Sequence, residues 1–562
     1  MFDRHFSHWP KGVSHHLTLP DHTIVQAVAE QVAKRGTGPA ITYHGHTLSY
    51  AEMWDQVEKL AAYLQQRCGV QKGDRVLLYM QNAPQYVIGF YAILRADAVV
   101  IPVNPMSRHA ELQHYAHDSG ATVMLTGQEL MEFATPLVEE DALSAIIVTH
   151  YGELADPDDD IPLPDPLGQL NPADIQGPGV TRWTDAIAAG LTPAADPQAT
   201  LDDLSVIPYS SGTTGQPKGC VHTHRSLLVV AYGGVIWNPM SETDISLSVL
   251  PFFHVTGMQA SMNGPLLSGG SMVIMTRWNR TNAAKLIKRY RITRWRSIAT
   301  MAIDLVNDPD FESYDLSSLE AIGGGGAAMP EAIAKKLKDM TGLDYIEGYG
   351  MSETIGATHI NPVQAPKRQC LGLPTFDVDC RVLAVSDDHE LGPNETGEII
   401  MSGPQIFLGY WRNETATREA FVDHDGKPFL RTGDLGYYDE DGYFFMVDRV
   451  KRMINAAGFK VWPAEVEMLM LKCAGIAEAC VIGAKDPRRG ETVKAYVVPS
   501  KSDPMTAEEI IGWCKGEMSA YKIPREIVFV DSLPKSGSNK VLWRQLQDQE
   551  REMQRTEEKA TG

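Results

Sequence analysis

Residues 209–219, with the sequence YSSGTTGQPKG, combine the residue types that suit a phosphate-binding loop. These eleven residues include three glycines, four serine or threonine hydroxyls, one proline and Lys218. Glycine and proline weaken helices and strands, so we expect a loop that turns its backbone N–H groups, hydroxyls and ammonium toward a polyanion. The loop differs from the P-loop of nucleoside triphosphatases, because Gly219 rather than Ser or Thr follows Lys218. A loop without a ligand is the alternative.

Six further motifs follow this loop along the chain. They are PFFHVTG at 251–257, GGGAAMP at 324–330, GYGMSE at 348–353, RTGDLG at 431–436, DRVKRMIN at 448–455 and PKSGSNK at 534–540. In type and order the set resembles the signatures of the adenylate-forming superfamily, which includes acyl-CoA synthetases, luciferases and peptide-synthetase adenylation domains. The resemblance covers more than half of the chain. It implies that ATP activates a carboxylic acid as an acyl-adenylate with release of pyrophosphate, and that the acyl group then passes to CoA.

Holding and neutralising phosphate charge is the main electrostatic task of such a reaction. The resemblance gives Glu353 the role of magnesium ligand, together with Thr213, and brings the Ser352 hydroxyl to the α-phosphate. One carboxylate is sufficient, because Mg²⁺ beside phosphates keeps several waters. A Ser-Glu pair at the N-cap of a helix is the alternative interpretation. The residues that the resemblance assigns to the β- and γ-phosphates are Ser210, Ser211, Gly212, Thr213, Thr214, Gly215 and Lys218.

The nucleoside contacts are also implied by the resemblance. Tyr349 corresponds to the aromatic residue that stacks on adenine, and Gly325, Gly326 and Ala327 to the strip on the other side of the purine. Asp434 offers two acceptor oxygens for the two ribose hydroxyls. Arg449 resembles a second ribose contact.

The reacting carboxylate and the thiol have their own candidate residues. His254 is expected to position the carboxylate, with a packed loop histidine as the alternative. Lys540 corresponds to the late lysine of the family, which bridges the carboxylate and the α-phosphate during adenylation. The resemblance also implies that the C-terminal domain rotates about a hinge at Lys451, which brings Gly458 to the pantetheine tunnel. Asn539 replaces the usual glycine before the lysine, but asparagine tolerates left-handed backbone geometry.

The acyl pocket is predicted to be apolar and roomy. Methionine and glycine make an adaptable wall, and none of the assigned residues supplies a charge. We therefore expect a fatty acid of medium or long chain, with an aryl or arylalkanoic acid as the alternative. The residues that the resemblance places near the acid are Trp237, His254, Met258, Met301, Gly323, Gly350, Met351 and Ile355.

Other functions with the same motifs stay open at this point. An acyl-AMP ligase could load a separate carrier protein, and a luciferase-like oxygenase could consume the same adenylate. A nucleotide-binding sensor without catalysis is the alternative outside enzymes. The leading prediction is an AMP-forming acid–CoA ligase, with ATP, Mg²⁺ and CoA as cofactors or co-substrates.

The elements that must position these residues follow an α/β rhythm. Short apolar runs alternate with amphipathic segments, which favours parallel sheets covered on both faces. We predict an N-terminal domain over residues 1–447, made of two α/β layers and a small β-rich subdomain, and a mobile α+β C-terminal domain over 448–562. The acidic, proline-rich residues 153–178 are expected to be a solvated loop, and the charged tail after 549 to fray.

Composition limits the possible partners and the compartment. The net charge of −21 argues against nonspecific binding to nucleic acid. No apolar run is long enough for a transmembrane segment. The seven cysteines are scattered and form no CxxC pair, which favours a reducing cytoplasm over a disulfide framework. The expected partners are a small carboxylic acid, ATP and CoA, and a homodimer is possible.

Overall fold

The computed structural model describes residues 2–210, 217–326, 329–449, 452–456, 459–486, 490–500, 503–535 and 541–561. The chain divides into two compact units. The first unit contains Met1–Asp379, Ser402–Leu430 and Asp441–Tyr443, and the second contains Cys380–Met401, Arg431–Glu440 and Phe444–Gly562. The domain boundary between residues 447 and 448 stays a prediction.

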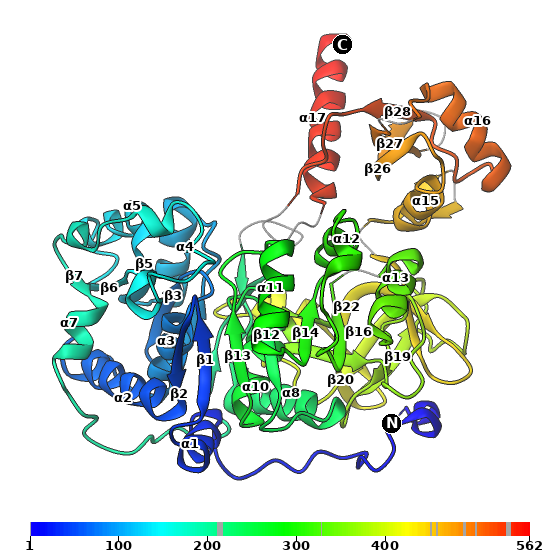
Figure 1. Ribbon diagram of the computed structural model, residues 1–562. Helices are drawn as coiled ribbons and strands as arrows, with labels where there is room; N and C mark the ends of the chain where they lie inside the picture. The colour runs from blue at the N-terminus through cyan, green and yellow to red at the C-terminus, as the bar shows by residue number, and fades with distance from the viewer. Residues whose placement is uncertain are drawn as a thin grey trace. The chain divides into compact units, whose positions relative to one another are not determined.

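Two sheets form the framework of the first unit (Figure 1). One has the order β11 (His222–Thr223), β8 (Leu204–Val206), β4 (Val99–Pro102), β3 (Arg75–Tyr79), β5 (Val123–Gly127), β6 (Ala145–Thr149) and β7 (Val180–Arg182). The other has the order β18 (Leu373–Pro374), β17 (Gly356–Ile360), β16 (Tyr345–Met351), β15 (Ala321–Gly325), β14 (Arg294–Ser297), β12 (Ile245–Ser248), β13 (Ser271–Ile274), β1 (Pro39–Tyr43) and β2 (His46–Ser49). The inner strands of both sheets are parallel, as the alternation of strands and helices predicts.

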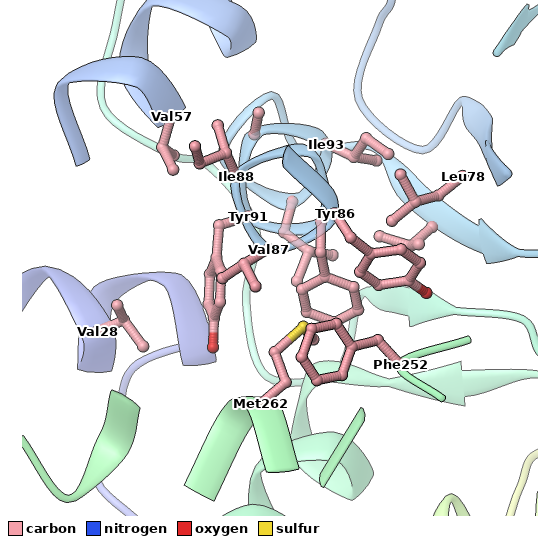
Figure 2. Close-up of a cluster of buried hydrophobic side chains, with 14 of the residues drawn as sticks. Val28, Val57, Leu78, Tyr86, Val87, Ile88, Tyr91, Ile93, Phe252 and Met262 are labelled. Carbon is pink, nitrogen blue, oxygen red and sulfur yellow. The ribbon is translucent and has the colours of Figure 1, made fainter. Parts of the chain in front are cut away.

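Helix α3 (Pro84–Arg95) is the most deeply buried helix near these sheets, with every residue buried. Pro84 stands in its first turn, where the missing N–H costs nothing. Figure 2 shows α3 end on, with side chains from several elements around it. Tyr86, Val87 and Tyr91 of α3 belong to one hydrophobic cluster with Phe252 and Met262, which lie far along the chain. Burial of this kind holds the two sheets to a common core.

A second hydrophobic cluster covers one face of the nine-stranded sheet. Trp295 of β14 and Ile322 of β15 point into it. The helices that pack there are α11 (Arg280–Tyr290), α12 (Ala299–Val306) and α13 (Glu331–Thr341), all on the same side of the strands in Figure 1. Because side chains alternate across a strand, the neighbours of Trp295 on β14 face the opposite side of the sheet.

Residues 40–50, in which His44–Gly45 is typical of a tight turn, form a hairpin at one edge of the nine-stranded sheet. β1 and β2 pair antiparallel, and the turn is His44–Gly45, both with positive φ.

The acidic, proline-rich residues 153–178 are attached to the rest of the first unit. Asp159 and Asp160 of this segment both pair with Arg289 of α11. Ile161, Leu167 and Ile175 of the same segment are buried in three different hydrophobic clusters. Residues 153–178 are therefore the surface loop that the composition predicts, but three apolar anchors that its charge hid hold it to the protein.

The second unit contains the residues predicted to form the small α+β domain, together with Cys380–Met401 and Arg431–Glu440, which were predicted to belong to the N-terminal domain. β22 (Lys427–Tyr438) pairs with β23 (Phe444–Arg449) in an antiparallel ladder. The C-terminal sheet has the order β25 (Phe459–Val461), β24 (Ile454–Ala456), β27 (Gly490–Pro499) and β26 (Ile476–Asp486), with β28 (Glu526–Phe529) also paired to β27. Helices α15 (Pro463–Met470) and α16 (Ala507–Glu517) contribute to its core. The predicted fold class is therefore confirmed.

The C-terminal tail is a helix rather than a frayed end. α17 (Trp543–Thr561) buries Leu546 and Glu550. The ammonium of Lys494 on β27 forms an ion pair with the carboxylate of Glu550, with Nζ 2.7 Å from Oε2. The same ammonium lies 2.7 Å from Oε1 of Glu526. This buried lysine compensates one of the charges of the tail, that of Glu550.

We find no helix in the described part of the chain that is long and apolar enough to cross a bilayer.

Candidate functional site

The base of the glycine-rich loop is a short hairpin. β9 (Tyr209–Ser210) and β10 (Lys218–Gly219) pair antiparallel, which places Ser210 opposite Lys218. Helix α4 (His109–Ser119) supports this hairpin: the Tyr209 hydroxyl donates to Asp118 at 2.5 Å. The structure thus pairs Ser210 and Lys218, the first and last of the expected phosphate ligands, on adjacent strands. The intervening predicted ligands Ser211, Gly212, Thr213, Thr214 and Gly215 lie outside the described residues.

Tyr410 connects the loop lysine to the predicted magnesium ligand. The ammonium of Lys218 lies 5.1 Å from the centre of the Tyr410 ring. The Tyr410 hydroxyl donates to Oε1 of Glu353 at 2.8 Å, and Glu353 is buried. Burial and the nearby carboxylate raise the pKa of Tyr410 well above its ordinary value, so the phenol stays a donor. The motifs do not include Tyr410. Backbone hydrogen bonds of residues 407–411 with residues 219–221 and with Glu353 bring it here.

Glu353 is held by its backbone as well as by its side chain. It lies in the short helix η8 (Ser352–Thr354) directly after β16. The Nε2–H of His222, on β11, donates to the Ser352 carbonyl across 2.7 Å, and burial lowers the pKa of His222 to about 4. A neutral imidazole therefore links the strand after the loop to the segment that carries the predicted magnesium ligand. The N-cap of η8 is Met351, so Ser352 is not the capping residue of the alternative interpretation.

The predicted adenine residues lie on adjacent strands. The ring of Tyr349 on β16 meets that of His359 on β17 edge to face, with centroids 5.6 Å apart. Gly325 of β15 pairs with Gly348, and a Cβ atom on Gly325 would lie 2.4 Å from the Gly348 carbonyl oxygen. The close contact between the two strands therefore requires glycine at position 325. This requirement holds whether or not a purine binds beside it. Gly326 has a φ of +86°, and Ala327 lies outside the described residues.

The two predicted ribose contacts bind one another within the second unit. Asp434 on β22 and Arg449 on β23 are register partners. The Nε of Arg449 lies 2.9 Å from Oδ1 of Asp434, which is only 1% exposed, whereas the Arg449 side chain is 43% exposed. The ion pair fixes the orientation of a buried carboxylate at the end of a ladder.

The predicted residues for the acid and the thiol are described only in part. His254 is exposed and caps helix α9 (Val255–Gly257), with Nδ1 accepting from the Thr256 N–H at 3.3 Å. A π-helix, η6 (Met258–Asn263), follows directly. Lys451, Gly458 and Lys540 lie outside the described residues.

The structure distributes the predicted acyl-pocket residues over several environments. Met258 and Ile355 belong to the cluster around α3, whereas Met301 belongs to the cluster on the other face of the sheet. Trp237 meets Trp9 edge to face at 4.6 Å and donates to the Asn361 carbonyl at 3.3 Å. Gly350 is exposed, and its neighbour Met351 is half-buried.

Sequence reasoning missed one charged residue beside this set. A Cβ atom on Gly323 would lie 2.8 Å from Nη1 of Arg296. Arg296 is the register partner of Gly323 in the adjacent strand. The alternation Arg-Trp-Arg at residues 294–296, typical of a strand with one apolar face, is the signal that could have revealed it.

Comparison with known proteins supports the resemblance. Residues 28–411 match the family of AMP-binding enzymes, and residues 465–540 match the AMP-binding enzyme C-terminal domain. A long-chain-fatty-acid–CoA ligase from Bacillus subtilis (strain 168) is 32% identical over 559 residues, covering 97% of each chain. A feruloyl-CoA synthase from Amycolatopsis sp is 32% identical, covering 90% of this chain and 94% of the relative. The crystal structure of ATP-bound MatB from Rhodopseudomonas palustris superposes with a TM-score of 0.83 at 25% identity, covering 94% and 99%.

The loop base, the buried carboxylate beside it and these matches agree with one another. The chain therefore belongs to the family of AMP-binding enzymes, and it is an AMP-forming acid–CoA ligase that uses ATP and CoA.

Proposed function

We propose that the enzyme activates a fatty acid of medium or long chain as its acyl-adenylate and transfers the acyl group to CoA. The observation that carries the catalytic part is the contact series Lys218–Tyr410–Glu353 at the base of the loop. It places an ammonium and a buried carboxylate on one tyrosine, as expected where phosphate and a cation meet. The B. subtilis relative, a long-chain-fatty-acid–CoA ligase, supports the choice of acid.

Within this proposal Glu353 holds Mg²⁺, with Thr213 as a second oxygen ligand. The donor set fits a hard cation, because carboxylate and hydroxyl oxygens are the ligands that Mg²⁺ prefers. When bound, the ion neutralises phosphate charge. Ser210 and Lys218, with the loop residues between them, hold the β- and γ-phosphates, and Ser352 reaches the α-phosphate.

The remaining roles follow the family resemblance. Tyr349 stacks on adenine beside the glycines of β15, and Asp434 and Arg449 hold the ribose. His254 and Lys540 align the carboxylate with the α-phosphate, so that the attacking oxygen meets reduced repulsion. Rotation at Lys451 then exchanges Lys540 for Gly458 and admits the CoA thiol.

An aryl acid is the second candidate substrate. The feruloyl-CoA synthase relative favours it, since that protein matches at the same identity as the fatty-acid ligase. A reducing cytoplasm is the proposed compartment, supported by the fact that all seven cysteines are thiols. A homodimer is the proposed assembly.

A rate panel tests the proposed acid. Octanoate, palmitate, phenylacetate, cinnamate and acetate are compared at fixed ATP, Mg²⁺ and CoA, with pyrophosphate and acyl-CoA both measured. We expect kcat/KM to rise with chain length, because each buried methylene adds up to about 0.8 kcal/mol of binding. A clear preference for phenylacetate or cinnamate would replace the fatty-acid proposal with the aryl one. Reaction with acetate alone would contradict a roomy pocket.

A further inference from the structure

Helix α4 contacts both ends of the glycine-rich loop. The loop leaves strand β9 after Ser210 and returns through Pro217 to strand β10. On the first side, the Tyr209 hydroxyl donates to Oδ2 of Asp118 at 2.5 Å. On the second side, Nε2 of His114 donates to the Pro217 carbonyl at 3.0 Å. A single helix therefore holds the chain where the loop begins and where it ends.

The two contacting residues of α4 stand four positions apart. Side chains at this spacing are neighbours on one face of a helix, so His114 and Asp118 point toward the hairpin together. Tyr115 also packs against the hairpin, with its ring centre 4.9 Å from that of Tyr209. Tyr115 is buried, whereas His114 and Asp118 are half-buried. The rigid spacing of one helical turn thus fixes the separation of the two loop ends.

Each contact has a defined donor and acceptor. Burial and the hydrogen bond to Asp118 raise the pKa of Tyr209 well above its ordinary value, so the phenol stays a donor. A carbonyl only accepts hydrogen bonds, so Nε2 of His114 carries the proton in its contact with Pro217. Proline has no backbone N–H, so its carbonyl is the one backbone group through which the chain is held at this position. Removal of the His114 donor therefore releases this end of the loop from α4.

The end of α4 also connects the loop to the buried carboxylate. The indole Nε1–H of Trp411 donates to the Asp118 carbonyl at 2.9 Å, and the Trp411 backbone N–H donates to the Gly219 carbonyl at 2.8 Å. The preceding residue, Tyr410, donates to Glu353. Asp118 is thus bonded to the loop base through its side chain and to the segment that carries Tyr410 through its carbonyl.

We propose that His114 and Asp118 are positioning residues for adenylation. By fixing the loop ends they set the separation of Ser210 and Lys218 before ATP binds, so that the β- and γ-phosphates meet groups already in place. Neither α4 residue contacts the nucleotide, and both act through the loop ends that they hold. The inference rests on the proposed function, because it takes Ser210 and Lys218 as phosphate ligands.

The first test compares the binding of ATP with that of AMP by calorimetry, in the presence of Mg²⁺ and without any acid. AMP carries no β- or γ-phosphate, so its affinity should not depend on the opening of the loop. We expect His114→Leu and Asp118→Ala each to weaken ATP binding about 10-fold, the effect of one lost hydrogen bond, and to leave AMP binding unchanged.

Conservative variants separate positioning from bulk. His114→Gln keeps a side-chain N–H donor and Asp118→Asn keeps an oxygen acceptor, so both should bind ATP nearly as the wild type does. The matched control is His117→Leu, since His117 belongs to the same helix and is exposed. Its ATP and AMP affinities should equal those of the wild type. Melting curves verify that each variant is folded.

The second test follows the two half-reactions. Displacement of catalytic groups by a fraction of an ångström is costly, so pyrophosphate release should slow about 10–10²-fold in His114→Leu and in Asp118→Ala. Thioester formation from preformed acyl-adenylate needs no β- or γ-phosphate and should proceed at the wild-type rate. A loss of general stability would slow both half-reactions together.

Two results would overturn the inference. One is an ATP affinity that equals the wild-type value in both folded variants; the other is an equal loss of ATP and AMP binding, which would make α4 a general support only. Failure of the proposed function is distinguishable, because the wild-type enzyme would then give no pyrophosphate and acyl-CoA with any acid of the panel, whereas the comparison of ATP with AMP binding requires no acid.

Discussion

At the scale of single residues, the site depends on groups that orient other groups. The Tyr410 hydroxyl donates to Glu353 at 2.8 Å and its ring lies under the ammonium of Lys218. The His222 imidazole fixes the carbonyl next to Glu353. A carboxylate held at its side chain and its backbone loses little freedom when a cation binds, which favours affinity.

The tyrosine contact gives the first prediction. Tyr410→Phe removes one hydrogen bond to a buried carboxylate, and the loss of such an orienting partner typically costs 10–100-fold in metal affinity. We expect the Mg²⁺ concentration for half-maximal pyrophosphate release to rise by about that factor. Tyr443→Phe is the control, because its hydroxyl donates at 2.7 Å to the Ala365 carbonyl instead. An unchanged Mg²⁺ dependence in Tyr410→Phe would contradict the proposal that Tyr410 orients Glu353 for the metal.

The buried histidine gives a pH prediction. Burial lowers the pKa of His222 from 6.5 to about 4, so the unfolded chain binds the proton more readily than the folded one between these values. The stabilisation is complete above pH 6.5 and is lost as pH falls toward 4, by about 3 kcal/mol at most. Denaturant unfolding at pH 7, 6, 5 and 4 should show a smaller decline for His222→Gln than for wild type. His46→Gln, at an exposed histidine, should follow the wild-type curve.

At the scale of elements, close approach of strands decides which positions must be glycine. A Cβ on Gly325 would meet the Gly348 carbonyl oxygen at 2.4 Å, whereas Gly234 in α8 (His224–Trp237) has nothing within 4 Å. The sequence alone does not distinguish the two glycines, but the space around their Cα atoms differs. Only the pairing of β15 with β16 distinguishes them.

This contrast gives a matched pair of alanine variants. Gly325→Ala should push β15 and β16 apart, at a cost of about 1–3 kcal/mol in unfolding free energy, and should raise the KM for ATP. Gly234→Ala should stabilise α8 by about 0.5–1 kcal/mol, since alanine favours a helix interior over glycine. Denaturant unfolding and ATP saturation curves measure both effects. Equal behaviour of the two variants would contradict the strand-contact argument.

At the scale of the whole molecule, the second unit is closed by the C-terminal helix. Lys494 of β27 pairs with Glu550 of α17 and with Glu526 of β28. The side-chain amide of Gln547 also bonds to both backbone groups of Gly483. The helix thus contacts the sheet along two of its turns, and its removal would leave a buried lysine half-paired.

A truncation tests this role of α17. A chain ending after residue 542 should lose amide-exchange protection in β26 and β27, because the sheet loses its cover and Lys494 loses one carboxylate. A chain ending after residue 554 keeps Glu550 and should retain protection. Hydrogen exchange followed by peptide mass spectrometry measures the difference. Equal protection in both would mean that the sheet is stable without the helix.

The proposed change from adenylation to thioester formation also involves the whole molecule, because it requires the C-terminal domain to rotate. Lys540→Ala should lower the rate of adenylation about 10²–10³-fold while thioester formation from preformed acyl-adenylate stays nearly intact. Lys535→Ala is the control, since Lys535 forms a partly exposed pair with Glu478 and such pairs contribute little. Similar loss in both half-reactions of Lys540→Ala would contradict the assigned role.

Local pattern was sufficient for much of the fold. The hairpin at His44–Gly45 and the start of helix α3 at Pro84 follow from local sequence, because turn chemistry and a first-turn proline act over a few residues. The family and its chemistry also followed from the sequence, because short motifs hold the phosphate ligands close together. The individual site roles stay predictions, and those at Lys451, Gly458 and Lys540 lie outside the described residues.

Tertiary structure alone decided the contacts between distant segments. Tyr410 reaches Glu353 because backbone hydrogen bonds hold residues 407–411 against the segment after the loop and against Glu353 itself. Arg294 pairs with Asp244, whereas Arg296, two residues along the same strand, has no carboxylate partner among the described residues. The buried anchors of residues 153–178 and the lysine under α17 were likewise invisible in local composition. Burial and charge pairing depend on which elements meet, and the periodicity of one segment does not contain that information.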